Sequence, residues 1–505
     1  MADLAAVPAL DQRPLLGNWR SIVIAFYACL FVALAFILSD TEKFIHWFIV
    51  PVTLCGALIG ADAVQWLRGR FDIFDPVGLL GLFGLHFFFL APLLIVAWDY
   101  QLLYLPPLDD WRPWLGQMAL LNLAGLALYR LSRRWIKPPA PDRPRRVWRL
   151  DGELFFIVLL FALAITFALQ LVVYQQFGGL EGYIDAYEER YVGETPSFTG
   201  FGALFTISES FPYLLMLCYA VWARRRGGGW RSWTVILLML LAFFVIRLFF
   251  GGLRGSRSNT LFALFWALTA IHVWVRPVPR RFLYAGLLLA LLFMYIMGFY
   301  KAVGLDFVEV LQNPSAAARL EEETNRTFRA ALLSDLSRAE IQPYLLYALA
   351  DPFSEYRYRW GSTYIGGLFT PVPSALWPAK PPTKVEAGSE ALYGSASFSQ
   401  SGTLRSSRVY GLAGEAALNF TPLAVPFAFI ALGLVVGWVR TRFVAWQPDD
   451  ARRLLLPLLV LVCFLALTAD SDLVTVFLVQ QGLVMFLAVW LSSPRRRTYT
   501  QDPAP

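Results

Sequence analysis

Long apolar runs alternate with short polar segments along the whole chain. A helix of about 20 apolar residues crosses a bilayer core about 30 Å thick. Runs of this kind predict twelve membrane spans, namely Ile22–Leu38, Phe44–Leu67, Val77–Trp98, Trp114–Leu131, Leu154–Val173, Phe201–Trp222, Trp233–Phe250, Ser258–Val275, Phe282–Tyr300, Pro422–Val439, Leu454–Ala469 and Thr475–Trp490. The runs at Ser258 and Leu454 are short, so the count is accurate to one or two. The pattern predicts an all-α polytopic membrane protein, with residues 1–505 as a single membrane domain.

The charges in the connecting loops predict how these spans are oriented. Basic residues gather in alternate loops, around positions 68–70, 133–149, 224–226, 276–281, 440–442 and 495–497, whereas the short loops between them are acidic or neutral. Loops rich in Lys and Arg remain on the cytoplasmic side of a membrane. With twelve spans every basic loop falls on that side, and both termini are expected to be cytoplasmic.

Composition agrees with this assignment and excludes several classes of protein. Hydrophobic residues make up 57% of the 505 positions and charged residues only 16%, and the mean hydropathy is +0.54. Soluble domains are typically about 25% charged, so a soluble enzyme, a disordered chain and a small secreted scaffold are excluded. The net charge of +7 lies mostly in the basic loops, so it sets orientation and does not indicate a nucleic-acid partner. All four cysteines lie in apolar runs, so neither a disulfide framework nor a metal site is expected.

Two segments on the opposite, external side are much longer than the other connections. They are residues 175–200 and residues 301–419, the latter between the ninth and tenth spans. Long loops in compact domains usually have a function. The first half of the larger loop has a helical pattern, and its second half is rich in Gly, Pro, Ser and aromatic residues. We therefore expect a small external loop at 175–200 and an ordered lid at 301–419.

Basic residues on this external side oppose the orientation rule and need a reason. Arg254 and Arg257 lie in a glycine-rich turn between the seventh and eighth spans. The long loops add, among others, Arg190, Arg357, Arg359, Lys380, Lys384, Arg405 and Arg408. A planar guanidinium binds phosphate or pyrophosphate in a bidentate manner, and glycines let backbone N–H groups approach an anion. The alternative is a network of arginines and carboxylates that holds the lid together.

Polar residues inside the spans are the other candidates for a site. Glu209 lies in the sixth span, about two turns from its external end, and a carboxylate at that depth indicates function by default. The alternative is a structural ion pair between Glu209 and Arg247 of the next span. His46, His86 and His272 are the only histidines. They lie far apart in apolar spans, so we interpret them as packing residues and expect no metal.

Several motifs of the lid and the nearby turns resemble one family. Residues 371–381, PVPSALWPAKP, resemble the Pro-Arg-x-Leu-Trp-Pro-x-Lys-Pro element of bacterial oligosaccharide repeat-unit polymerases, the O-antigen polymerase type. Gly414-Glu415 followed by Asn419-Phe420 resembles that family's Gly-Glu…Asn-Phe-Gly segment, and residues 252–257 are similar to its Arg-Gly-x-Arg turn. Residues 74–76 and 177–190 also fit. Two departures are Ser374 in place of the family's Arg and Thr421 in place of its Gly.

The resemblance implies a GT-C-like glycosyltransferase of about twelve spans in the bacterial inner membrane, without a cofactor. Such an enzyme transfers a growing glycan from undecaprenyl pyrophosphate to an incoming undecaprenyl-pyrophosphate-linked repeat unit at the periplasmic face. A flippase and a chain-length regulator are the implied partners. The catalytic candidates are Glu415 and Glu209, with Asp470 and Asp472 behind them. The candidates for binding pyrophosphate are Arg254, Arg257, Arg190, Arg405, Arg408 and Lys380.

Three other functions remain open at this point. A ligase of lipid-linked glycan shares this topology but typically uses a histidine in its large periplasmic loop, and residues 301–419 contain none. A polyprenyl-phosphate-sugar glycosyltransferase needs an acidic pair in its first external loop, where only the very short segment with Asp40 and Glu42 is present. A flippase or transporter of lipid-linked oligosaccharide predicts inverted repeats and short external loops, which the asymmetric lid opposes.

Overall fold

Apolar helices make up most of the chain, as the sequence pattern predicts. The computed structural model describes residues 19–102, 105–137, 145–184, 202–254, 257–324, 327–373, 376–394, 397 and 408–499. The helices before the lid are α1 (Trp19–Ser39), α2 (Thr41–Phe44), α3 (Ile49–Leu67), α4 (Pro76–Leu85), α5 (Ala91–Ala97), α6 (Arg112–Ser132), α7 (Gly152–Gln176), α9 (Gly202–Ser208), α10 (Phe211–Arg226), α11 (Trp233–Phe249), α12 (Arg257–Ala270) and α13 (Arg280–Val303).

The remaining elements form the lid and the C-terminal part. The lid contains α14 (Phe307–Gln312), α15 (Pro314–Thr324), α16 (Phe328–Ala330), α17 (Ile341–Ala350), α18 (Ser362–Leu368), α19 (Lys384–Tyr393) and α21 (Gly411–Asn419). The last helices are α22 (Val425–Ala445), α23 (Leu456–Thr468), α24 (Ser471–Phe477) and α25 (Val484–Leu491). Two strands, β1 (Arg145–Arg149) and β2 (Arg495–Tyr499), complete the described chain.

Within these described ranges, nine helices are long and apolar enough to cross a membrane. They are Trp19–Ser39, Ile49–Leu67, Pro76–Ala97, Gly152–Gln176, Leu204–Arg226, Arg280–Tyr300, Pro422–Ala445, Ala451–Thr468 and Ser471–Leu491. Two more of the twelve predicted runs are shorter apolar helices, Trp233–Phe249 and Asn259–Val275. The twelfth is α6, which has 21 residues but includes Arg112 and Arg130. The chain is therefore an all-α polytopic membrane protein with one small sheet, and all twelve predicted runs are helical.

The spans form two sets of packed helices joined by α22 and α23. Helix α3 packs against α1, α4 and α6, and α22 packs against α6 and α23, while α10, α11 and α12 form the second set. A buried ion pair strengthens the first set, because Arg133 Nη1 lies 2.9 Å from Asp62 Oδ2 and both side chains are 1% exposed. Asp75 accepts a hydrogen bond from Val77 N at the start of α4 and lies 3.1 Å from Arg440 of α22. Asp75, from the motif at residues 74–76, therefore holds α4 and α22 together.

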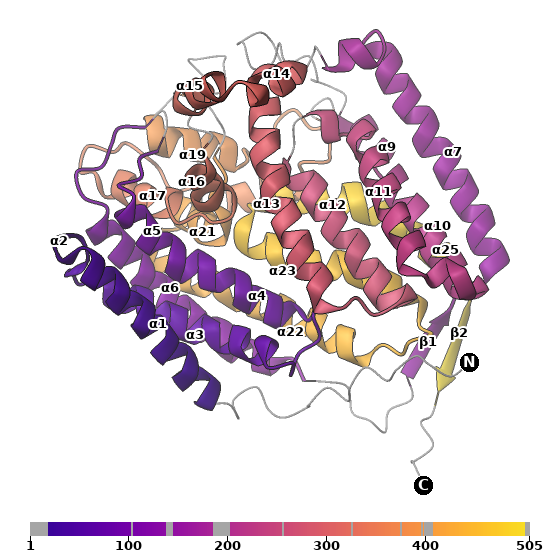
Figure 1. Cartoon of the computed structure of the whole chain (residues 1–505), viewed down its shortest axis with the longest axis horizontal. Helices are drawn as coiled ribbons and strands as arrows, with labels where there is room; N and C mark the ends of the chain where they lie inside the picture. Colours follow the sequence, from indigo (N-terminus) through magenta and orange to yellow (C-terminus); the bar gives the residue numbers. More distant parts are fainter. Residues whose placement is uncertain are drawn as a thin grey trace.

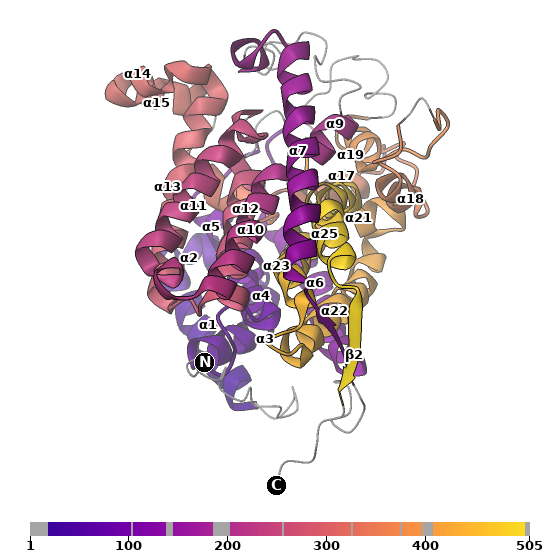
Figure 2. The same ribbon diagram turned by 90° about the vertical axis from the view of Figure 1, so that its right-hand side faces the viewer.

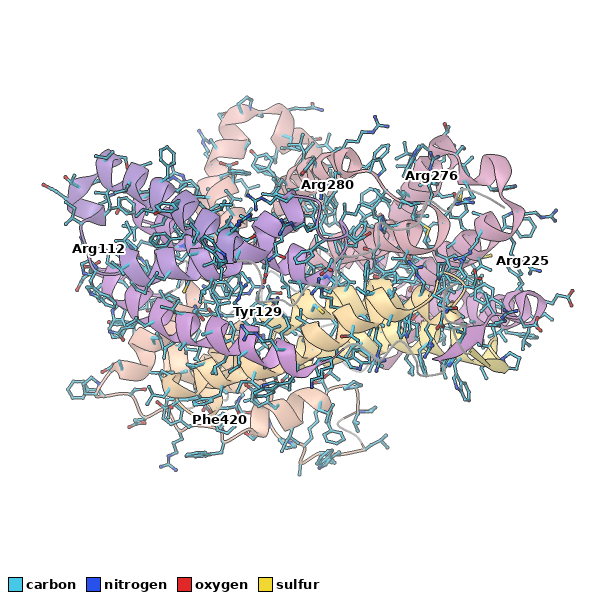
Figure 3. All side chains as sticks on the ribbon, turned by 90° about the horizontal axis from the view of Figure 1, so that it is seen from below. Arg112, Tyr129, Arg225, Arg276, Arg280 and Phe420 are labelled. Atoms are coloured by element: carbon cyan, nitrogen blue, oxygen red, sulfur yellow. The ribbon has the colours of Figure 1, made fainter. Side chains whose placement is uncertain are left out.

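The two ends of the bundle differ in character, and we name them by their contents. The lid end is where the helices of residues 301–419 lie, with α14 and α15 at the top of both side views (Figures 1 and 2). The basic end lies opposite and carries the arginines at the ends of α6, α10 and α22 and at the start of α13. Seen from below, Arg225, Arg276 and Arg280 are spread across one side of the molecule (Figure 3).

The described part of the lid is attached to the bundle at several points. Tyr344 Oη donates a hydrogen bond to the carbonyl of Pro106 at 3.1 Å, and Tyr100 Oη lies 3.0 Å from Ser334 Oγ. His86, in a π-helical turn between α4 and α5, places Nε2 2.9 Å from the carbonyl of Leu332. These contacts join the lid to the π-helical turn before α5 and to the loop after it.

A two-stranded sheet at the basic end is not predicted by the apolar pattern. Strand β1 pairs antiparallel with β2, with Arg145 opposite Tyr499 and Arg149 opposite Arg495. In Figure 1 the strands lie below α25 and the lower end of α7. The sheet therefore ties the segment before α7 to the segment after α25.

Candidate functional site

Glu415 lies on α21 at the lid end and is 2% exposed. Its Oε1 accepts hydrogen bonds from Thr363 Oγ1 at 2.9 Å and from Ser471 Oγ at 2.6 Å, and its Oε2 accepts one from Ser471 N at 2.7 Å. Thr363 comes from α18 and Ser471 from the start of α24. Three segments distant in sequence therefore meet at one carboxyl group.

A buried ion pair lies beside this carboxyl group. Lys384 Nζ at the start of α19 is 2.6 Å from Asp470 Oδ2, and the two side chains are 3% and 0% exposed. Asp470 also accepts hydrogen bonds from the backbone N–H groups of Tyr410 and Gly411, which begin α21. We call Glu415, Thr363, Ser471, Asp470 and Lys384 the Glu415 cluster.

The surroundings of Glu415 raise the pKa of its carboxyl group. Glu415 precedes the span that begins at Pro422, so it lies outside the spans. Burial, followed by the negative charge of Asp470, raises the pKa of Glu415 from 4.5 to about 7, although Ser471 and Thr363 donate hydrogen bonds that favour the ionised form. A group with this pKa can accept and release a proton at physiological pH.

Asn419 connects Glu415 to a group of aromatic side chains. Its side chain donates to the carbonyl of Glu415 at 2.9 Å and accepts from Gly361 N at 3.0 Å, and its carbonyl accepts from Trp360 N at 2.7 Å. Trp360 has a φ of 48° and is 76% exposed. Its ring packs edge-on against Phe420, which is stacked with Tyr364. A non-glycine residue in this backbone region is uncommon and is held here by its surroundings.

Glu209 forms a second buried cluster, and the predicted alternative of an ion pair with Arg247 is observed. Arg247 Nη2 lies 3.1 Å from Glu209 Oε2, and both side chains are 1% exposed. Gln480 Nε2 donates to the same oxygen at 2.6 Å. Gly251, with a φ of 102°, lies against the carboxyl group, because a Cβ atom there would be 2.4 Å from Glu209 Cδ. We call Glu209, Arg247 and Gln480 the Glu209 cluster.

One helical segment connects the two clusters. Ser471 binds Glu415 at the start of α24, and Gln480 binds Glu209 in the π-helical turn Leu478–Leu483 that follows. At a rise of 1.5 Å per residue these positions are about 13 Å apart. Glu415 and Glu209 are therefore attached to opposite ends of the same segment and do not share one carboxylate pair.

The basic residues predicted to bind pyrophosphate lie in different places in the structure. Arg190 and Arg405 lie outside the described residues. Arg254 ends a short turn, Gly252–Arg254, and Arg257 begins α12, but only their backbone is described. The carbonyl of Arg408 accepts a hydrogen bond from Lys384 Nζ at 2.7 Å, which joins Arg408 to the Glu415 cluster. Lys380 Nζ donates to the carbonyl of Val372 at 3.2 Å, a contact within the Pro-rich loop.

Sequence reasoning missed two features of the lid end. The first is the pair of hydroxyl donors, Thr363 and Ser471, which carry no motif of their own. The second is Glu340, which precedes α17 and is 3% exposed. Burial raises the pKa of Glu340 to about 7, against the positive charges of Arg338 and Arg408. The helical pattern in the first half of the larger loop predicted helices in this part of the lid, but the burial of one particular glutamate leaves no periodic signal.

The three histidines, interpreted from the sequence as packing residues, also make polar contacts. His272 Nε2 lies 3.0 Å from Asp72 Oδ2, and its Nδ1 accepts a hydrogen bond from Val278 N. Among the residues that the structure describes, no group of three His, Cys, Asp or Glu side chains could hold a metal ion. No protein-family model, curated protein or solved structure matches this chain.

Proposed function

We propose that this protein is a membrane glycosyltransferase that polymerises lipid-linked oligosaccharide repeat units. The growing glycan is transferred from undecaprenyl pyrophosphate to an incoming undecaprenyl-pyrophosphate-linked repeat unit at the periplasmic face of the bacterial inner membrane. The observation that carries this proposal is Glu415, a buried carboxyl group with a pKa of about 7 in the segment that resembles the polymerase family. The orientation follows from the basic end, which the positive-inside rule assigns to the cytoplasm.

In the proposed step Glu415 is the general base. It accepts the proton of the acceptor hydroxyl group while that oxygen forms a bond to the anomeric carbon of the growing glycan. The bond from the anomeric carbon to the phosphate oxygen breaks, and undecaprenyl pyrophosphate leaves with the electron pair. The hydrogen bonds from Thr363 and Ser471 support this role, because they fix the orientation of the carboxylate.

The leaving pyrophosphate needs positive charge close to the reacting bond. We assign this role to Arg254 and Arg257, with Arg190, Arg405, Arg408 and Lys380 as further candidates. One observation supports the first two. Helix α12 begins at Arg257 and packs against α23, which ends at Thr468, immediately before the Asp470–Ser471 segment. Because the two helices are antiparallel, the start of α12 and the Glu415 cluster lie toward the same end of the bundle.

The acceptor sugar needs a surface beside the base. We assign this role to the rings of Trp360, Tyr364 and Phe420, because Asn419 links them to the backbone of Glu415. Aromatic faces pack well against the C–H faces of sugar rings, and the large exposed area of Trp360 leaves its ring accessible. In this arrangement Glu415 is the catalytic residue and Trp360 positions the acceptor.

The architecture of the bundle suits this chemistry. The proposed fold is a GT-C-like bundle of twelve spans, which comprises the nine long apolar helices, α11, α12 with its π-helical end, and α6. The donor and the acceptor are both lipid-linked, so no nucleotide-sugar domain is needed. In the proposal the ion pair between Glu209 and Arg247 aligns the turn that carries Arg254 and Arg257.

The proposal is tested by replacing Glu415 in cells that make the corresponding glycan. The Glu415→Gln variant is expected to reach the membrane at normal levels and to accumulate single lipid-linked repeat units, seen on a gel as one band in place of a ladder. The control is Glu386→Gln, because Glu386 is a partly exposed lid carboxylate that pairs with Arg359.

Other outcomes would overturn the proposal in recognisable ways. Full-length polymer in the Glu415→Gln strain would remove Glu415 as the base. Polymer that accumulates on the carrier lipid would identify a ligase, and a failure to deliver repeat units to the outer leaflet would identify a flippase.

A further inference from the structure

A hollow at the basic end gathers arginines that the proposed reaction does not use. It has a volume of about 360 Å³ and is lined by Arg149, Leu150, Gly152, Val221, Arg224, Arg225, Trp274 and Asp449. These residues come from the end of β1, the start of α7, the end of α10, the π-helical turn after α12 and the loop after α22. We call this hollow the arginine pocket.

The guanidinium groups of the pocket are held in position by their surroundings. The Arg224 guanidinium lies 4.2 Å from the centroid of the Trp274 ring, a cation–π contact. Arg225 packs on the backbone at the start of α7, because a Cβ atom on Gly152 would lie 1.8 Å from Arg225 Nη1. The backbone of Arg149 is fixed at the end of β1 by the pairing with β2. Three arginines therefore line one hollow, one from β1 and two from α10.

Three acidic residues near the pocket must also be counted. Asp449 Oδ1 is 3.0 Å from Arg224 Nη2, but its side chain is 80% exposed, and such exposed pairs contribute little. Asp151 accepts hydrogen bonds from Glu153 N and Leu154 N, so it caps α7. Glu153 is exposed in the first turn of α7. Among the described residues Arg225 has no carboxylate within ion-pair distance, so positive charge predominates at the hollow.

The surroundings of the pocket indicate an amphipathic ligand. Helix α7 runs from the pocket toward the lid end along the outer side of the bundle (Figures 1 and 2). Its outward face carries Ile157, Leu160, Phe161 and Ile165, all more than half exposed. Leu150, Val221 and Trp274 add apolar surface inside the pocket itself. A charged headgroup in the pocket would therefore place its hydrocarbon chains along an apolar helix surface.

We propose that the arginine pocket binds the phosphate headgroup of an anionic glycerophospholipid, with its acyl chains on α7. Arginine matches the oxygens of a phosphodiester, and basic pockets between spans on the cytoplasmic side are suited to anionic headgroups. The bound lipid bridges β1, α7 and α10 at the basic end. This site is independent of the proposed polymerase activity, which lies at the lid end.

Native mass spectrometry of the full-length protein in detergent tests the site. Phosphatidylglycerol is the probe, and phosphatidylcholine with the same acyl chains tests the need for net negative charge. Each arginine near a membrane surface is worth about a fivefold change in affinity, so Arg224→Ala with Arg225→Ala is expected to bind phosphatidylglycerol about 25-fold more weakly. The wild-type protein is expected to prefer phosphatidylglycerol over phosphatidylcholine.

The matched control removes the same charge from the same end of the molecule. Arg68 and Arg70 are exposed and do not line the pocket, so Arg68→Ala with Arg70→Ala is expected to bind phosphatidylglycerol like the wild type. If the double pocket variant does not fold, the single Arg225→Ala variant is used, because that side chain is exposed, and a fivefold loss is expected.

Three results would overturn the proposal. Equal losses in the pocket and control variants would mean that the basic end attracts lipid by diffuse charge. Equal binding of the two lipids would remove the charge requirement. Displacement of the bound lipid by glycerol 3-phosphate at equal concentration would identify a site for a soluble phosphate in place of a membrane lipid.

Discussion

Replacing Glu415 with glutamine tests whether its carboxyl group is desolvated, because desolvation makes the stability of the wild-type protein depend on pH. The pKa of Glu415 rises from 4.5 to about 7, mainly because of burial. A shift of this size corresponds to about 3 kcal/mol of free energy between the protonated and ionised forms. The carboxyl group is 2% exposed, so solvent screening reduces this value little.

The sign of the pH dependence follows from the direction of the shift. A carboxyl group with a raised pKa in the folded state favours folding fully below pH 4.5, and this contribution is lost as the pH rises through about 7. Glutamine stays neutral at every pH and can still accept the hydrogen bond from Ser471 N. The stability of the variant relative to the wild type is therefore expected to increase by up to about 3 kcal/mol between pH 4.5 and pH 8.

The measurement is the midpoint of thermal unfolding of both proteins in the same detergent from pH 4.5 to pH 8.5. Polymer formation measured in parallel is expected to fall in the wild type as the pH decreases through about 7, because the base becomes protonated. The Glu386→Gln variant is expected to show the same pH dependence as the wild type, because the carboxylate that it removes is partly exposed. A constant stability difference between Glu415→Gln and the wild type at all pH values would refute the reasoning, because it would show that the carboxyl group is not desolvated.

Three further perturbations test the two clusters and the aromatic group. Gly367→Ala is expected to reduce polymer formation at least tenfold, because the new Cβ would lie 2.2 Å from Ser471 Oγ and 2.8 Å from Asp472 N, so the start of α24 and its donors to Glu415 must shift. A gel of lipid-linked glycans measures the polymer, and the amount of membrane protein is measured beside it. Arg247→Met is expected to lower the free energy of unfolding by about 3–5 kcal/mol, because it leaves the buried charge of Glu209 unpaired. Adding Glu209→Gln is expected to recover part of that loss in thermal unfolding, and no recovery would contradict the ion pair. Trp360→Ala is expected to raise the KM for the acceptor about tenfold at nearly unchanged kcat, whereas Trp360→Phe is expected to stay close to the wild type. A fall in kcat alone would contradict a positioning role for Trp360.

The helices could be predicted from sequence because a bilayer leaves the backbone little choice. Inside hydrocarbon every backbone N–H and C=O group must be satisfied within the segment, so an apolar run becomes a helix. The boundaries were less predictable. The run Phe201–Trp222 is interrupted at Glu209–Ser210, between α9 and α10, where Glu209 and Ser210 turn toward the segment that contains Gln480.

The site was predictable only in part. Glu415 was selected by its motif, and Glu209 by the penalty for a carboxylate within a span, and both are buried. The pairing of Lys384 with Asp470 and the donation from Thr363 could not be predicted, because these residues come from segments far apart in sequence and none of them follows a helical period. The β1–β2 sheet was missed for the same physical reason, since polar strands at residues 145 and 495 carry no local signal that they will pair.

The pairing of β1 with β2 also has a consequence for the order in which the protein is completed. Strand β1 is made well before its partner, residues Arg495–Tyr499, because every helix from α7 to α25 lies between the two strands in the sequence. Both strands lie at the same end of the bundle, so pairing requires no passage through the bilayer. Closure of the basic end therefore follows the synthesis of all the spans between the two strands. A variant in which residues 495–499 are deleted is expected to insert every span and still leave this end open.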